Sequence, residues 1–192
     1  MKSATKTLLS SLLASAAIVT MASLPTAAAA GQPVGPNATP FGIEISVAPC
    51  SVARTKLGAV TEKKLGDSDV LLTAKNPSNL YDGANEVIVR CQSNQVVAVQ
   101  FEASKGGMGS ESSREVYSGL SRKYKLVAGG PMPQLGNGYA RFASGNTIIE
   151  QSAPHLSFEF TVTYYAKDFY ESIVAENQAK TQKTRNDKQA TL

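Results

Sequence analysis

The chain has 192 residues, of which 42% are hydrophobic and 18% charged, with a formal net charge of +4 and a pI near 9.0. The positive charge is concentrated at the two ends, because Lys2 and Lys6 precede residue 31 and residues 180–192 carry a net +3. The body between them is close to neutral, which excludes the basic surface that nucleic-acid binding requires.

Residues 1–30 have the three parts of an export signal, in the expected order. Two lysines open the segment, an apolar stretch without acidic residues follows, and Ala28 and Ala30 form the small-x-small pattern that a signal peptidase accepts. We expect cleavage before Gly31, a periplasmic or secreted location and no membrane span. A retained membrane anchor is the alternative, which the Ser, Thr and Ala residues within the stretch disfavour.

The two cysteines of the chain lie after this segment, at Cys50 and Cys91. In an oxidising compartment a pair of cysteines is more often bonded than free, so we predict a Cys50–Cys91 disulfide. Closing a loop of that length stabilises the fold by about 4 kcal/mol in the chain-entropy model. The alternative is a catalytic or redox thiol, but the chain has no C-x-x-C pair and a single histidine.

Composition divides the chain into four segments. After the predicted signal peptide, residues 31–40 are rich in Pro and Gly and predict a flexible leader. Residues 41–177 predict one α+β domain, since this length supports a single core and is short for two. Residues 178–192 predict a disordered basic tail.

The first half of the domain begins with alternating apolar and polar residues at 41–45, which predict a half-buried strand. A helix follows, for which Ser46 is the predicted cap and Gly58 the left-handed stop. Its apolar spacing places Cys50 on the buried side. A strand at 70–74 and a hairpin over 86–101 complete this half, with Cys91 pointing inward.

The second half begins with a helix whose start is marked by a capping box. Ser112 and Glu115 have the spacing at which each side chain satisfies the other's backbone N–H. Val116, Leu120 and Tyr124 form the apolar stripe of this helix. The helix is therefore expected to pack on a sheet, as the first one does.

A loop rich in Gly and Pro spans 128–138, and strands are predicted at 138–143, 147–151 and 156–165. The last strand alternates throughout, with Leu156, Phe158, Phe160, Val162 and Tyr164 on one face. A short helix at 167–177 ends the predicted fold. One packed and one wet sheet face indicate antiparallel pairing.

The order of elements predicts an α+β fold, an antiparallel sheet with helices packed on one face. A helix followed by a meander occurs twice, about 65 residues apart in the sequence. Two repeats are one hypothesis, and a plain α+β sheet with helices on one face is the alternative. The run Gly42-Ile43-Glu44-Ile45 before a helix that ends at Leu57-Gly58 resembles the repeat unit of the β-lactamase inhibitor protein and of small outer-membrane assembly lipoproteins.

That resemblance covers residues 42–101 and 112–165 and implies a helix-on-sheet scaffold used for binding proteins. The chain departs from the lipoproteins in having no cysteine at its predicted mature start, where theirs is acylated. No specific motif matches, so no functional residue is carried over.

Evidence for catalysis is weak. His155 is the single histidine, and no Ser, Cys or Asp motif lies beside it to complete a catalytic site. One His, two bonded cysteines and scattered carboxylates do not predict a metal site, and no motif predicts a cofactor.

The sequence therefore predicts an exported, non-enzymatic protein that binds a protein or a cell-envelope component through a sheet face or the loop 128–138. Tyr165 and Tyr170, in an aromatic cluster near the end of the fold, are the candidate interface residues. One alternative is an envelope hydrolase that uses His155 with Glu150 or Glu159. Another is a carrier of a small apolar ligand, which requires a cavity between helices and sheet.

Overall fold

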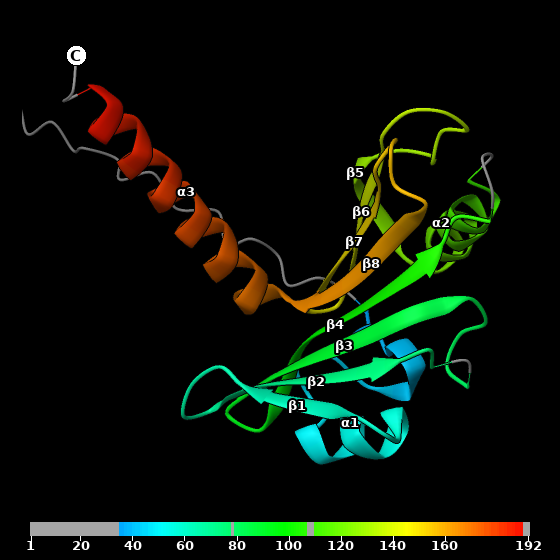
Figure 1. Cartoon of the computed structure of the whole chain (residues 1–192), viewed down its shortest axis with the longest axis vertical. Coiled ribbons are helices and arrows are strands. Elements are labelled where there is room, and N and C mark those ends of the chain that lie inside the picture. Colours follow the sequence, from blue (N-terminus) through cyan, green and yellow to red (C-terminus); the bar gives the residue numbers. More distant parts are fainter. Residues whose placement is uncertain (1–34, 78, 107–109, 190–192) are drawn as a thin grey trace, which may run out of the picture. The chain divides into compact units, whose positions relative to one another are not determined.

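The computed structural model describes residues 35–77, 79–106 and 110–189 (Figure 1). Within these residues an eight-stranded antiparallel sheet is combined with three α-helices, which confirms the predicted α+β class. The predicted signal peptide lies outside the described residues. Among the helices that are described, none combines the length and the hydropathy that crossing a bilayer requires.

Each half of the fold is one helix followed by four strands. The first half, after a 3-10 turn at Pro40–Gly42, comprises α1 Cys50–Leu57, β1 Thr61–Lys64, β2 Asp69–Lys75, β3 Ala84–Gln92 and β4 Gln95–Ser104. The second half comprises α2 Glu111–Lys123, β5 Lys125–Gly129, β6 Gly138–Ser144, β7 Thr147–Ala153 and β8 Glu159–Ala166. The helix α3, Lys167–Gln189, follows β8 directly.

The strand order is β1-β2-β3-β4-β8-β7-β6-β5, so the last strands of the two halves pair with each other at the centre. This pairing is antiparallel and sets Val99 opposite Tyr164 and Phe101 opposite Val162. Two meanders that meet at their final strands form one continuous sheet. The arrangement agrees with the predicted pair of helix-plus-meander repeats.

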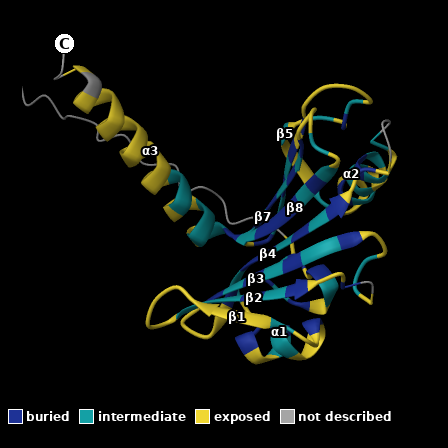
Figure 2. Cartoon of the chain, viewed as in Figure 1, coloured by how far each residue is buried: buried dark blue, intermediate teal, exposed yellow. Residues whose placement is uncertain are grey.

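One face of the sheet carries the core. Side chains alternate along the strands, and the inward set includes Val89, Phe101, Phe142, Ile149 and Val162. Helix α1 contacts β3 and β4 on this face, and α2 contacts β6 (Figure 1). Figure 2 shows that the buried residues lie along the inner strands of the sheet, whereas β1 and the residues of α3 from 175 to 187 are exposed.

Helix α3 differs from the prediction in length and in the face that it contacts. The short helix 167–177 and the disordered tail from 178 were expected, but α3 continues to Gln189. Ion pairs between residues four apart, such as Glu176 with Lys180, support a polar helix of this kind. Its first turn contacts the sheet face opposite to α1 and α2, where Arg90 lies 4.8 Å from the ring centroid of Phe169.

The segment before α1 is ordered differently from the prediction. The flexible leader 31–40 is wrong for its described part, because Ala38 is buried and its N–H donates to Thr147 Oγ1 at 3.1 Å. The strand at 41–45 is also wrong, since a 3-10 turn stands there and Phe41 has a φ of 54°. A positive φ interrupts an extended strand. Ile43 and Ile45 are buried nonetheless, so the alternation predicted which side chains are buried but not the backbone conformation.

The two predicted helix starts are wrong in detail. Ser46 does not cap α1, which begins at Cys50 after Pro49, and Ser46 has a φ of 69° in the preceding turn. Helix α2 begins at Glu111, so Ser112 is already inside it, and its cap Ser110 makes no side-chain cap hydrogen bond. The predicted position of the stop is confirmed, because α1 ends at Leu57 and the N–H of Gly58 donates to the Arg54 carbonyl. The left-handed helical conformation is not, since Gly58 combines a φ of 75° with a ψ of −121°.

The predicted disulfide is present between Cys50 on α1 and Cys91 on β3, with the two Cα atoms 5.8 Å apart. Both residues are buried, on the face that the spacing predicted. The bond joins a helix to the strand beneath it across 41 positions of sequence.

Candidate functional site

Three large apolar side chains are exposed to solvent at one end of the sheet. Leu135, in the loop between β5 and β6, is 74% exposed, whereas Leu156 and Phe158, between β7 and β8, are 92% and 83% exposed. All three line one hollow of about 290 Å³. We call Leu135, Leu156 and Phe158 the apolar tip.

The apolar tip corrects the prediction for the last strand. Alternation predicted that Leu156 and Phe158 point inward with Phe160, but β8 begins only at Glu159. A turn precedes the strand, in which Ser157 N–H donates to the Pro154 carbonyl at 3.2 Å. The two side chains therefore never enter the sheet, and the regular pattern concealed an exposed patch.

His155 holds the two loops of the tip together. Its Nδ1 accepts from the N–H of Gly136 at 3.0 Å, and its own N–H donates to Asn137 Oδ1 at 2.8 Å. The ring thus acts as a strut between the β5–β6 loop and the β7–β8 loop. Because Nδ1 is already an acceptor here, only Nε2 is left to act on a substrate.

The carboxylates that the hydrolase alternative needs are engaged elsewhere. Glu150 Oε1 accepts from Tyr139 Oη at 2.8 Å, Arg141 Nε at 2.9 Å and Tyr170 Oη at 3.0 Å. Glu159 Oε1 accepts from Asn85 Nδ2 at 2.8 Å. Neither carboxylate lines the hollow beside His155 in the described part of the chain, so the structure does not bring this predicted pair together.

Lys105 lines the same hollow and is the residue that sequence reasoning missed. Its side chain is 4% exposed, and its ammonium donates to the Pro154 carbonyl. None of the carboxylates in residues 35–77, 79–106 and 110–189 forms an ion pair with it. Burial lowers the pKa of Lys105 below its ordinary value, since a low-dielectric site disfavours the charged form. A lone lysine after a strand gave no sequence signal of this burial.

Tyr165 and Tyr170, the predicted interface residues, lie together on the sheet face opposite to α1 and α2. Their ring centroids are 5.4 Å apart, and Arg141 stacks 5.2 Å from the ring of Tyr170. Tyr170 thereby attaches the first turn of α3 to the sheet, through Tyr165 and Arg141 and through its hydrogen bond to Glu150. Burial and the bond to Glu150 raise the pKa of Tyr139 to about 12.

A second hollow, of about 280 Å³, lies beside α2 on the core side of the sheet. We call it the aromatic cleft, because five of its lining residues are aromatic: Phe41, Tyr81, Phe101, Tyr124 and Tyr164. Burial raises the pKa of Tyr164 above its ordinary value. Gly119 of α2 also lines the cleft, and a Cβ added there would meet no atom within 4 Å.

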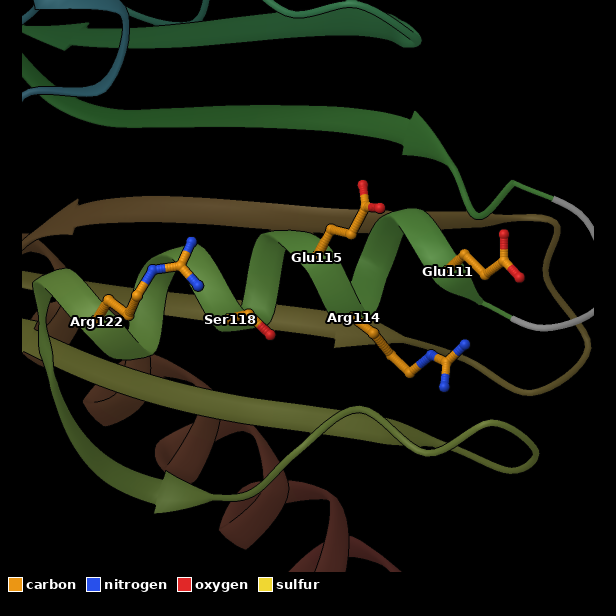
Figure 3. A pocket seen from close by; sticks show the side chains of 5 residues that line it. All are labelled: Glu111, Arg114, Glu115, Ser118 and Arg122. Carbon is orange, nitrogen blue, oxygen red and sulfur yellow. The ribbon is translucent and has the colours of Figure 1, made fainter.

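The outer surface of α2 carries a third hollow, of about 770 Å³, whose lining residues all come from this one helix. Figure 3 shows Arg114 and Glu115 pointing to opposite sides of the helix. Charges of both signs alternate along it, as on an ordinary solvated helix surface. We assign no function to this surface.

Comparison with protein-family models, with curated proteins and with solved structures finds no match. The layout resemblance to the β-lactamase inhibitor protein therefore stays a prediction. In the described part of the chain, no three His, Cys, Asp or Glu residues are grouped so that they could hold a metal ion.

Proposed function

We propose that the chain is an exported, non-enzymatic binding protein that contacts a partner protein or an envelope component through the apolar tip. The observation that carries this proposal is the exposure of Leu135, Leu156 and Phe158 around one hollow. Contiguous exposed apolar groups mark interaction sites in soluble proteins. Fully burying a Leu or Phe side chain in a partner contributes about 1.5–3 kcal/mol.

Hydrogen bonds within the chain fix the two loops of the apolar tip without a partner. The His155 strut ties the two loops, and the N–H of Lys105 donates to the Phe158 carbonyl at 2.9 Å. Ordering of loops is a cost of association, so a surface that is already fixed binds more tightly for the same area. The disulfide is compatible with an oxidising compartment outside the cytosol.

Photo-crosslinking in the native envelope tests the proposal. A photoreactive phenylalanine analogue is placed at Phe158, at Leu135 and, as the matched control, at the exposed Thr61 of β1. We expect the same adduct mass from 158 and 135 and none from 61. Equal labelling at all three positions, or no adduct at the tip, would contradict the proposal.

The aromatic cleft favours a second function, the carriage of a small apolar ligand between α2 and the sheet. Its aromatic lining supports this alternative, and Gly119 offers a way to test it. Gly119→Leu should fill the cleft, whereas Gly119→Ala adds a single methyl group and improves helix propensity. Fluorescence of N-phenyl-1-naphthylamine should rise with the wild type and the Ala variant and fall with the Leu variant. Equal fluorescence in all three would exclude the cleft.

A further inference from the structure

We propose that the apolar tip accepts a peptide segment that carries a carboxylate, and that this carboxylate pairs with Lys105. The inference rests on the proposed function and names the chemistry of its partner. Lys105 would then be an ion-pairing residue within a hydrophobic contact site.

Lys105 is buried beside a neutral group. It is 4% exposed, and within the described residues the hydrogen-bond partner of its ammonium is the carbonyl of Pro154. Burying a charge without an opposite charge is costly, and such groups are normally paired. A lysine in this position is therefore set to receive an anion that the described part of the chain does not supply.

The N-terminal end of α2 lies next to Lys105. The Ser112 N–H donates to the Lys105 carbonyl at 3.2 Å, which places the first turn of the helix directly beside Lys105. Ser110, the residue before the helix, lines the hollow. The N-terminal end of a helix carries a partial positive charge, so it adds to the field of the ammonium. Glu111 lines the hollow on the outer surface of α2, and not the tip (Figure 3).

The walls of the hollow are largely apolar. Leu135, Leu156 and Phe158 line the same hollow as Lys105. A wholly apolar partner would leave Lys105 unpaired, and a small hydrophilic anion would leave the three side chains in water. A partner that carries a carboxylate next to apolar side chains would pair with Lys105 and also cover the three apolar side chains. A peptide offers this combination at a C-terminus with apolar residues, or at an acidic residue with apolar neighbours.

Peptide titration followed by NMR tests the inference. The probes are acetyl-Ala-Val-Leu-Phe with a free C-terminal carboxylate and the same peptide as its carboxamide. The ¹⁵N-labelled protein, with its disulfide intact, reports binding through the amide signals of Gly136 and Ser110. We expect the free acid to bind on the order of tenfold more tightly than the carboxamide, as a charge-assisted contact would give.

Three variants separate the charge from the apolar contact. Lys105→Met should abolish the preference for the acid and keep the affinity for the carboxamide, whereas Lys63→Met, on the exposed strand β1, should keep the preference. Phe158→Ser should weaken both peptides.

Equal affinities for the two peptides, both lost in Phe158→Ser, would overturn the role of Lys105 and leave the proposed function standing. No saturable shift with the acid up to about 10 mM, or tighter binding of sodium decanoate than of the peptide, would overturn the assignment to a peptide.

Discussion

In the first half of the molecule, a disulfide joins α1 to the sheet, whereas in the second half α2 is held without any covalent link. Helix α1 has eight residues, of which Cys50, Ala53 and Leu57 are buried. Helix α2 has 13 residues, and the fully buried Gln151 of β7 donates from Nε2 to the Ser113 carbonyl at 2.6 Å. A short helix buries little apolar surface, so the covalent bond provides stability that packing alone does not. The order of helix and strands is the same in the two halves, but the interactions that attach each helix to the sheet differ.

The largest expected effect is on the first half. Replacing Cys50 and Cys91 together with Ala should lower the free energy of unfolding by about 4 kcal/mol, because the denatured chain regains the freedom of the closed loop. Urea denaturation followed by circular dichroism measures this loss. Reduced wild-type protein is the control and should match the double variant. A loss below about 1 kcal/mol would mean that α1 packs well enough by itself.

A smaller effect is expected when the polar contact of the second half is broken. Gln151→Ala should cost about 2–3 kcal/mol, through the lost hydrogen bond and the cavity. Gln151→Leu should cost about 1 kcal/mol, because it fills the space and removes Oε1, which has no partner among the described residues. The same urea experiment compares the two. If the Leu variant lost as much stability as the Ala variant, the hydrogen bond of Gln151 would contribute more to the free energy of unfolding than its packing.

The smallest effect concerns the tyrosine cluster on the opposite face of the second half. The folded-state pKa of Tyr139, about 12, lies above its ordinary value of 10.0. Its contribution to stability is therefore complete below pH 10 and is lost as the pH rises through about 12. Since the side chain is partly exposed, we expect well under 1 kcal/mol. The ultraviolet difference between wild type and Tyr139→Phe, recorded against pH, should titrate near 12. A midpoint near 10 would show that neither the burial of Tyr139 nor its bond to Glu150 is present in solution.

The sequence predicted those parts of the fold in which one face of an element is buried. Alternation located the hairpin of β3 and β4 and pointed Cys91 inward, and helical spacing placed Cys50 on the buried side. The disulfide itself was predicted from a pair of cysteines in an exported chain, and these placements agree with it. Strand β1 was missed because its residues Thr61–Lys64 are all exposed, as suits an edge strand, and leave no periodic pattern.

The site was less predictable, because its residues are defined by where strands end and how loops meet. Leu156 and Phe158 continue the inward alternation of β8, and only the turn at Pro154 removes them from the sheet. The burial of Lys105 arises from loops that are distant in sequence. His155 was singled out as a chemical group, but its observed contacts are those of a loop strut.

The pairing of β4 with β8 at the centre of the sheet has a consequence for the order of folding. Both cysteines and the strands around them precede residue 105, so the first meander and its covalent link can be complete while β8 is still unformed. Until β8 arrives, β4 is an open edge that can recruit any strand. Because contacts between such distant segments form slowly, the joining of β8 to β4 should be the late, rate-limiting event and the stage most exposed to misassembly.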